Sequence, residues 1–162
     1  MRRAHIGFNC YVRKFRKSFS LIAKRRVCIL SGTPLRKDEL NVRMKEILVV
    51  DDDSMYIELV KEVSSSMNVS VVAARNGKDA LSVLQTTSVD MIVSDVSMPV
   101  MDGRTFHVQV LKNEQWAKIP FVFMTGMADD VIRGYVAKTP GVRLIRKENL
   151  VDELTDLLST LR

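Results

Sequence analysis

Residues 47–50 read ILVV and lead directly into an acidic cluster, DDD, at residues 51–53. A second apolar run, MIVS at residues 91–94, ends in the same way at Asp95. Short aliphatic runs with polar boundaries are typical of parallel strands that are covered on both faces. Because ligands of an open parallel α/β sheet gather beyond the carboxyl ends of its strands, we expect the two acidic groups to converge there.

Asp51, Asp52 and Asp95 therefore form a predicted cation site. Carboxylates that lie close together repel one another unless a cation lies between them. Mg²⁺ is the expected ion, because it prefers hard oxygen ligands and often takes only one or two carboxylates, with water or phosphate oxygens completing its octahedron.

Two later apolar runs end at the same predicted edge. Residues 120–124 (PFVFM) lead into Thr125, and residues 142–146 (VRLIR) lead into Lys147. A hydroxyl and an ammonium beside a cation and a carboxylate can bind the oxygens of a phosphoryl group. Each residue alone has an ordinary explanation, since a strand-end Asp is often a helix cap and a strand-end Lys a solvated charge. Their shared position after successive strands favours a phosphoryl site.

From about Met44 to the end, the sequence resembles the receiver domain of bacterial two-component response regulators, in its single-domain, chemotaxis-regulator-like form. The stretch from Asp95 through Met98-Pro99 to Gly103 is the most specific part of the resemblance. The matching stretches are ILVVDDD (47–53), Asn76-Gly77 with Ala80-Leu81, DMIVSDVSMPVMDG (90–103), PFVFMTG (120–126) and Lys147.

The resemblance implies a role for each site residue. Asp95 would accept the phosphoryl group, Thr125 would be the switch hydroxyl, and Lys147 would bind the phosphate. The implied Mg²⁺ ligands are Asp51, Asp52, Asp95 and the backbone carbonyl of Ser97. Such a protein is not an enzyme, beyond catalysing its own phosphorylation and dephosphorylation. Its implied partners are a sensor histidine kinase or phosphotransfer protein as donor and a separate effector protein as recipient of the signal.

The remaining residues alternate as a βα repeat does. Ser54 is the expected cap of the first helix, and residues 64–68 are expected to break it. Residues 69–73 predict the second strand, and residues 128–136 predict a shorter fourth helix. Right-handed crossovers would build a flavodoxin-like, doubly wound α/β fold, with a five-stranded parallel sheet in the order 2-1-3-4-5 after a basic extension.

Two positions depart from the family pattern. Glu148 follows Lys147 where the family usually has a proline, so the loop before the last helix is expected to be freer, with an added acid beside the lysine. Leu144 occupies the position where many receivers carry an aromatic residue that moves inward on activation. The coupling of Thr125 to an aromatic side chain is therefore not expected to work here in the usual way. Ser97 and Met127 occupy positions that influence the loss of phosphate in the family.

The positive charge of the chain is concentrated before residue 44. Residues 1–43 hold twelve Lys or Arg against two acids, a net charge of +10, whereas residues 44–162 hold 13 against 17, a net charge of −4. We expect residues 1–43 to be a disordered leader or the product of a start site assigned too early, and residues 44–162 to be the receiver, with no residues left for an effector domain.

The alternative for residues 1–43 is a helix that binds nucleic acid or a membrane surface, with an apolar side among basic residues. That apolar side would comprise Tyr11, Phe15, Phe19 and Ile22. Both cysteines, Cys10 and Cys28, also lie in this segment, which fits a reducing cytoplasm. The chain contains no apolar run of about eighteen residues of the kind that a transmembrane helix needs.

An enzyme reading competes with the signalling one. Phosphohydrolases of the haloacid-dehalogenase type also use a strand-end aspartate with Mg²⁺, and residues 51–53 contain an Asp-x-Asp. Met55 stands where that family has Thr or Val, and the predicted domain is short for it. Net turnover of phosphate esters would distinguish the two classes.

Overall fold

The computed structural model describes residues 45–127 and 130–160. The predictions made for the basic extension, including its amphipathic helix and its domain boundary at residue 44, lie outside these residues. In the part of the chain that the structure describes, no helix is both long enough and apolar enough to span a bilayer.

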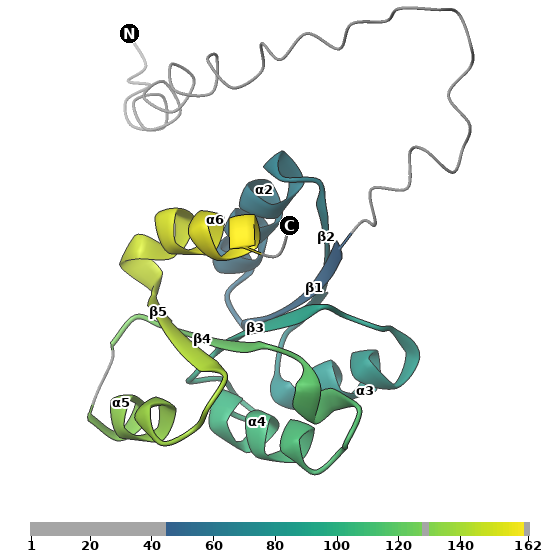
Figure 1. The fold of residues 1–162 in the computed structure, drawn as a ribbon, viewed down its shortest axis with the longest axis vertical. Helices are drawn as coiled ribbons and strands as arrows, with labels where there is room; N and C mark the ends of the chain where they lie inside the picture. The colour runs from purple at the N-terminus through teal and green to yellow at the C-terminus, as the bar shows by residue number, and fades with distance from the viewer. Residues whose placement is uncertain (1–44, 128–129, 161–162) are drawn as a thin grey trace, which may run out of the picture. The chain divides into compact units, whose positions relative to one another are not determined.

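The described residues form one parallel sheet in the strand order β2-β1-β3-β4-β5 (Figure 1). The strands are β1 (Lys45–Val50), β2 (Val69–Ala74), β3 (Met91–Asp95), β4 (Phe121–Thr125) and β5 (Val142–Arg146). This order confirms the predicted doubly wound topology, in which β2 lies on one side of β1 and β3, β4 and β5 follow on the other side.

Helices cover both faces of the sheet. They are α2 (Ser54–Ser66), α3 (Gly77–Thr86), α4 (Gly103–Leu111), α5 (Asp130–Ala137) and α6 (Leu150–Thr160), with short 3₁₀ turns η1 (Trp116–Lys118) and η2 (Lys147–Asn149). In Figure 1, α2 and α6 lie on one side of the sheet and α3, α4 and α5 on the other. The predicted fourth helix is observed as α5, and residues 128–129 before it lie outside the described residues.

The core consists of two apolar layers that meet in the central strands. Ile47 and Val49 point into the layer under α2 and α6, whereas Leu48 and Val50 point into the layer under α3 and α4. All four side chains are fully buried. Burial of one such side chain stabilises the fold by about 1.5–3 kcal/mol, so the strand that carries the acidic cluster is held firmly between the two layers.

The start of α2 corrects one prediction. The sequence predicts Ser54 as the helix cap, but the side chain of Asp53 accepts a hydrogen bond from the backbone N–H of Met55, and Ser54 is already helical. The Asp53 N–H in turn donates to Asp51 Oδ1 at 2.9 Å, which turns the chain from β1 into the helix. At the other end, the helix continues through Ser66, so the break predicted at residues 64–68 begins later, at the C-cap Met67, and Asn68 follows with a φ of 56°.

Candidate functional site

The polar residues predicted from the sequence follow four neighbouring strands at one edge of the sheet. The register pairs Val50 with Ser94, so Asp51 and Asp95 both lie at adjacent strand ends. On the other side, Asp95 pairs with Met124 and Thr125 with Arg146, the residue before Lys147. Because all these strands are parallel, the four functional groups share one edge, as the sequence predicts.

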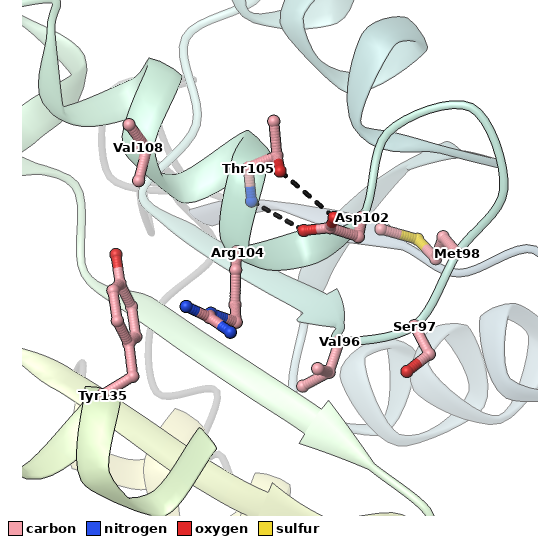
Figure 2. A pocket seen from close by; sticks show the side chains of 8 residues that line it. All are labelled: Val96, Ser97, Met98, Asp102, Arg104, Thr105, Val108 and Tyr135. Atoms are coloured by element: carbon pink, nitrogen blue, oxygen red, sulfur yellow. Dashed lines mark hydrogen bonds between the residues drawn. The ribbon is translucent and has the colours of Figure 1, made fainter. Parts of the chain in front are cut away.

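A hollow of about 800 Å³ opens beside this edge, next to the loop that follows β3 (Figure 2). Asp102 lines it and caps α4 by accepting a hydrogen bond from the Thr105 N–H at 2.7 Å. Its lining residues are Val96, Ser97, Met98, Asp102, Arg104, Thr105, Val108 and Tyr135. None of the three clustered carboxylates belongs to this lining, so the hollow adjoins the polar cluster and does not contain it.

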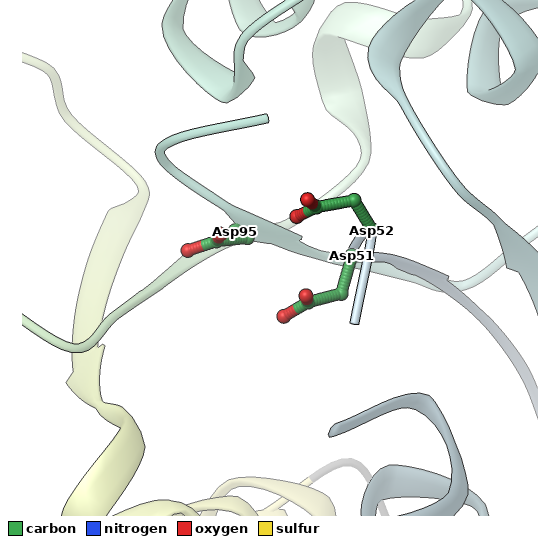
Figure 3. Close-up of side chains that lie close together, drawn as sticks. All are labelled: Asp51, Asp52 and Asp95. Atoms are coloured by element: carbon green, nitrogen blue, oxygen red, sulfur yellow. The ribbon is translucent and has the colours of Figure 1, made fainter. Parts of the chain in front are cut away.

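Three carboxylates converge at the strand ends (Figure 3). One oxygen from each of Asp51, Asp52 and Asp95 lies within 4.8 Å of the others. Asp51 is fully buried and Asp52 is exposed. Asp51 Oδ2 is buried and accepts no hydrogen bond of good geometry, but it forms an ion pair with Lys147 Nζ at 2.7 Å. Three clustered carboxylates supply the hard oxygen ligands that Mg²⁺ prefers.

Lys147 reaches into the cluster from the start of η2. Its Nζ lies 2.7 Å from Asp51 Oδ2 and 3.2 Å from Asp95 Oδ2, and only 10% of its side chain is exposed. Burial lowers the pKa of the Lys147 ammonium, but the two carboxylates together outweigh burial and leave this pKa above its ordinary value. Lys147 is therefore a fixed positive charge at the acidic cluster.

Asp95 is held from several directions. Its Oδ1 accepts a hydrogen bond from the Val96 N–H at 2.8 Å, and the Ser94 hydroxyl donates to its carbonyl oxygen at 2.9 Å. Burial raises the pKa of the Asp95 carboxyl, Lys147 lowers it, and Asp51 raises it further, with a net increase. The carboxylate is thus poorly hydrated but remains beside a cationic group.

Gly103 explains how the loop after β3 packs against Asp95. A methyl group at residue 103 would overlap the Asp95 carbonyl oxygen and approach Ser94 Oγ to 3.1 Å. The Gly103 N–H also donates to the Val96 carbonyl at 2.9 Å. The close approach of the helix α4 to the end of β3 therefore requires glycine at this position.

Thr125 is buried at the end of β4, where the sequence places it. Its hydroxyl donates to the Met127 carbonyl at 2.8 Å and accepts from the Met127 N–H at 3.2 Å. Met127 itself is 86% exposed. The Thr125 hydroxyl is thus engaged within its own loop, next to an exposed apolar side chain.

Two residues that contribute to this geometry were not singled out by sequence reasoning. Tyr56 places its ring centroid 4.0 Å from Lys147 Nζ, and Ser94 supports Asp95 as described above. The position of Tyr56 in the first turn after the acidic cluster is a signal that could have identified it. Glu148 was expected to add an acid beside Lys147. In the structure its carboxylate pairs with Arg146, 3.0 Å from Nε.

Comparison with known proteins yields consistent similarities. The family model described as the response regulator receiver domain matches residues 47–159. A probable transcriptional regulator, ycf29, of Pyropia yezoensis is 32% identical over 92 residues, which are 56% of this chain and 41% of that protein. The sensor protein GacS of Pseudomonas syringae pv. syringae is 34% identical over 120 residues, which are 72% of this chain and 13% of that protein.

A solved structure shows the same fold. The chemotaxis response regulator CheY4 of Vibrio cholerae superposes with a TM-score of 0.62 at 26% identity, covering 70% of this chain and 98% of that one. The chain spans less than half the length of the two curated relatives named above, which contain further residues outside the matched part.

Proposed function

Because the chain belongs to the response regulator receiver domain family of two-component systems, we propose that it is a phosphoacceptor switch whose acceptor is Asp95. Receiver domains are signalling switches and not classical enzymes. The observation that carries the proposal is the position of the Asp95 carboxylate at the end of β3, 3.2 Å from Lys147 Nζ and within 4.8 Å of two further carboxylates.

The metal part of the proposal concerns four ligands. Mg²⁺ would be held by Asp51, Asp52, Asp95 and the backbone carbonyl of Ser97. The cluster of Asp51, Asp52 and Asp95, with one oxygen of each within 4.8 Å of the others, supports this assignment. When bound, the cation would neutralise the clustered carboxylates and the charge that develops on the phosphoryl oxygens.

In the proposed transfer, a carboxylate oxygen of Asp95 attacks the phosphorus of a phosphohistidine. An O–P bond to Asp95 forms as the P–N bond of the donor breaks, and the donor imidazole keeps the electron pair of that bond. The Lys147 ammonium is already fixed beside Asp95 and would bind one phosphoryl oxygen by a charge-assisted hydrogen bond. Little rearrangement of the lysine is then needed during the reaction.

The switch would begin at Thr125. To bind a phosphoryl oxygen, its hydroxyl must leave the Met127 carbonyl, which frees the loop between β4 and α5 to adopt a second arrangement. Leu144 lies half-buried on β5 in the layer under α3, α4 and α5, so no aromatic ring moves at that position. The signal would therefore leave through the Met127 loop and α5.

We propose a sensor histidine kinase or phosphotransfer protein as the donor and a separate effector protein as the recipient. The similarity to a part of the sensor protein GacS supports the donor class. A cytoplasmic location and the boundary at residue 44 belong to the same proposal, as does any binding of nucleic acid or membrane through residues 1–43. These three points rest on the sequence alone.

The phosphohydrolase alternative finds no support in the geometry. Its second aspartate would be Asp53, but the Asp53 carboxylate caps α2 through the Met55 N–H at 2.8 Å. An acid that is engaged as a helix cap is poorly placed to protonate a leaving group.

Phosphorylation with a small donor tests the proposal. With Mg²⁺ and acetyl phosphate, the intact protein should gain the mass of one phosphoryl group, and Asp95→Asn should gain none. Asp53→Asn is a matched control, because asparagine caps helices as well as aspartate does, and this variant should be labelled like the wild type. Equal labelling of the Asp95→Asn variant would refute the assignment, and continuous release of phosphate from simple phosphate esters would favour the hydrolase.

A further inference from the structure

Lys147 has a third neighbour besides the two carboxylates. The ring centroid of Tyr56 lies 4.0 Å from Lys147 Nζ, within the range of a cation–π interaction. The ammonium is therefore contacted by Asp51, Asp95 and Tyr56, which come from the ends of β1 and β3 and from the first turn of α2. The interaction is also shielded, because only 10% of the lysine side chain is exposed.

The loop around Lys147 provides little restraint of its own. Lys147 begins a three-residue 3₁₀ turn, and Glu148 stands where a proline ring would limit the backbone. The Glu148 carboxylate pairs with Arg146, and both side chains of this pair are about half exposed, at 57% and 49%. Exposed ion pairs of this kind contribute little to stability. A lysine side chain loses rotamer freedom when it is held in one conformation, so side-chain contacts rather than the loop must restrain it.

Tyr56 is suited to that task. Its ring packs against the apolar layer under α2 and α6, which anchors it to the core. An aromatic face attracts an ammonium without accepting its hydrogen bonds as a carboxylate does. The ring can therefore hold Lys147 near Asp95 without adding a further carboxylate that would compete with a phosphoryl oxygen.

We propose that Tyr56 is a positioning residue that holds Lys147 at the phosphoryl site through its ring face. This inference rests on the proposed function of Lys147 in binding the phosphoryl group. The simpler alternative is that Tyr56 only fills space above the core. The two alternatives differ in their requirement for a ring, since a space-filling role is also met by an aliphatic side chain of similar size.

Two variants of the full-length protein separate these alternatives. Tyr56→Phe keeps the ring face, and Tyr56→Leu removes it. Protons above an aromatic face are shifted upfield, so the ε-methylene signal of Lys147, assigned with Lys147→Arg, should be upfield in the wild type and in Tyr56→Phe but not in Tyr56→Leu. Tyr135→Leu is a matched control, because Tyr135 lies under Arg104 and its loss should leave the Lys147 signal unchanged.

The same variants should differ in the rate of labelling by acetyl phosphate. We expect Tyr56→Leu to be slower by about fivefold or more, as expected for loss of a shielded cation–π contact, and Tyr56→Phe to retain nearly the wild-type rate. If Tyr56→Leu does not fold, Tyr56→Met, which fills space without a ring, takes its place.

The outcomes distinguish this inference from the proposed function. If the wild type takes up no phosphate, the proposed function fails, and the Lys147 signal still reports whether the ring holds the lysine. If the wild type is labelled and Tyr56→Leu matches it in rate and in Lys147 signal, the positioning role is wrong. Equal slowing of Tyr56→Phe and Tyr56→Leu would also overturn the proposal, because the hydroxyl and not the ring would then matter.

Discussion

Val100 is held in an unfavourable backbone conformation in the loop between Asp95, the proposed phosphoacceptor, and α4. Its φ is +68°, and the Met101 N–H donates to the Pro99 carbonyl at 2.7 Å, which closes a three-residue turn around it. A β-branched residue is rarely found in this region, since its side chain crowds the backbone. The side chain is 78% exposed, so burial does little to offset the cost. The loop between Asp95 and α4 therefore stores strain at one residue.

Val100→Gly should raise the free energy of unfolding by about 1 kcal/mol, because the relieved strain of about 1–3 kcal/mol exceeds the entropy cost of glycine. Urea denaturation measures the change. Val131→Gly is the control of opposite sign: Val131 is also exposed, at 59%, but lies within α5, where glycine should destabilise the helix. A less stable Val100→Gly variant would show that the turn is not strained.

Helices α4 and α5 are joined by a partly buried polar contact. His107 Nδ1 on α4 lies 2.8 Å from the Tyr135 hydroxyl on α5, and the His107 ring centroid lies 4.5 Å from that of Phe121. His107 is only 2% exposed, and burial lowers its pKa below the ordinary value of 6.5. Burial thus favours the uncharged imidazole at the contact with α5, the helix through which the signal is proposed to leave.

This contact predicts a loss of stability in acid. The unfolded chain binds a proton at His107 near pH 6.5, whereas the folded protein resists it to lower pH, so stability falls as pH decreases through that window. Urea denaturation at several pH values should show a smaller decline for His107→Gln, which stays neutral, than for the wild type. Parallel declines in both proteins would contradict the assignment.

At the scale of the whole molecule, the acidic cluster connects metal binding to folding. Three carboxylates are brought together only when β1 and β3 pair within the sheet, so Mg²⁺ should bind the folded chain and not the unfolded one. The central strands that carry the cluster are almost completely buried, so the site cannot open without disrupting the core.

Mg²⁺ at ten times its dissociation constant should stabilise the protein by about 1.4 kcal/mol. Asp52→Ala should lose most of this effect and bind Mg²⁺ about tenfold more weakly. Without metal, the same variant should be at least as stable as the wild type, since Asp52 is exposed and its removal relieves repulsion. Thermal denaturation with and without Mg²⁺ measures both effects, and an unchanged response in Asp52→Ala would contradict the shared site.

The strand order and the edge that carries the site were predictable from local sequence patterns. The central strands β1, β3 and β4 are buried on both faces and are therefore short apolar runs, and right-handed crossovers leave few ways to arrange them with the two edge strands. The polar residue that ends each run is then placed by the topology alone. Asp51, Asp95, Thr125 and Lys147 could therefore be assigned to one edge, and the receiver-like stretch from Asp95 to Gly103 indicated their chemistry.

The contacts between side chains were decided by the tertiary structure. Whether Asp53 or Ser54 caps α2 depends on how the chain turns at Asp51, and sequence spacing alone predicted the wrong residue. The approach of Tyr56 to Lys147 and that of His107 to Tyr135 join residues far apart in the chain. Such contacts depend on rotamers and helix packing, which are set by the complete core, because each side chain takes the space that its neighbours leave.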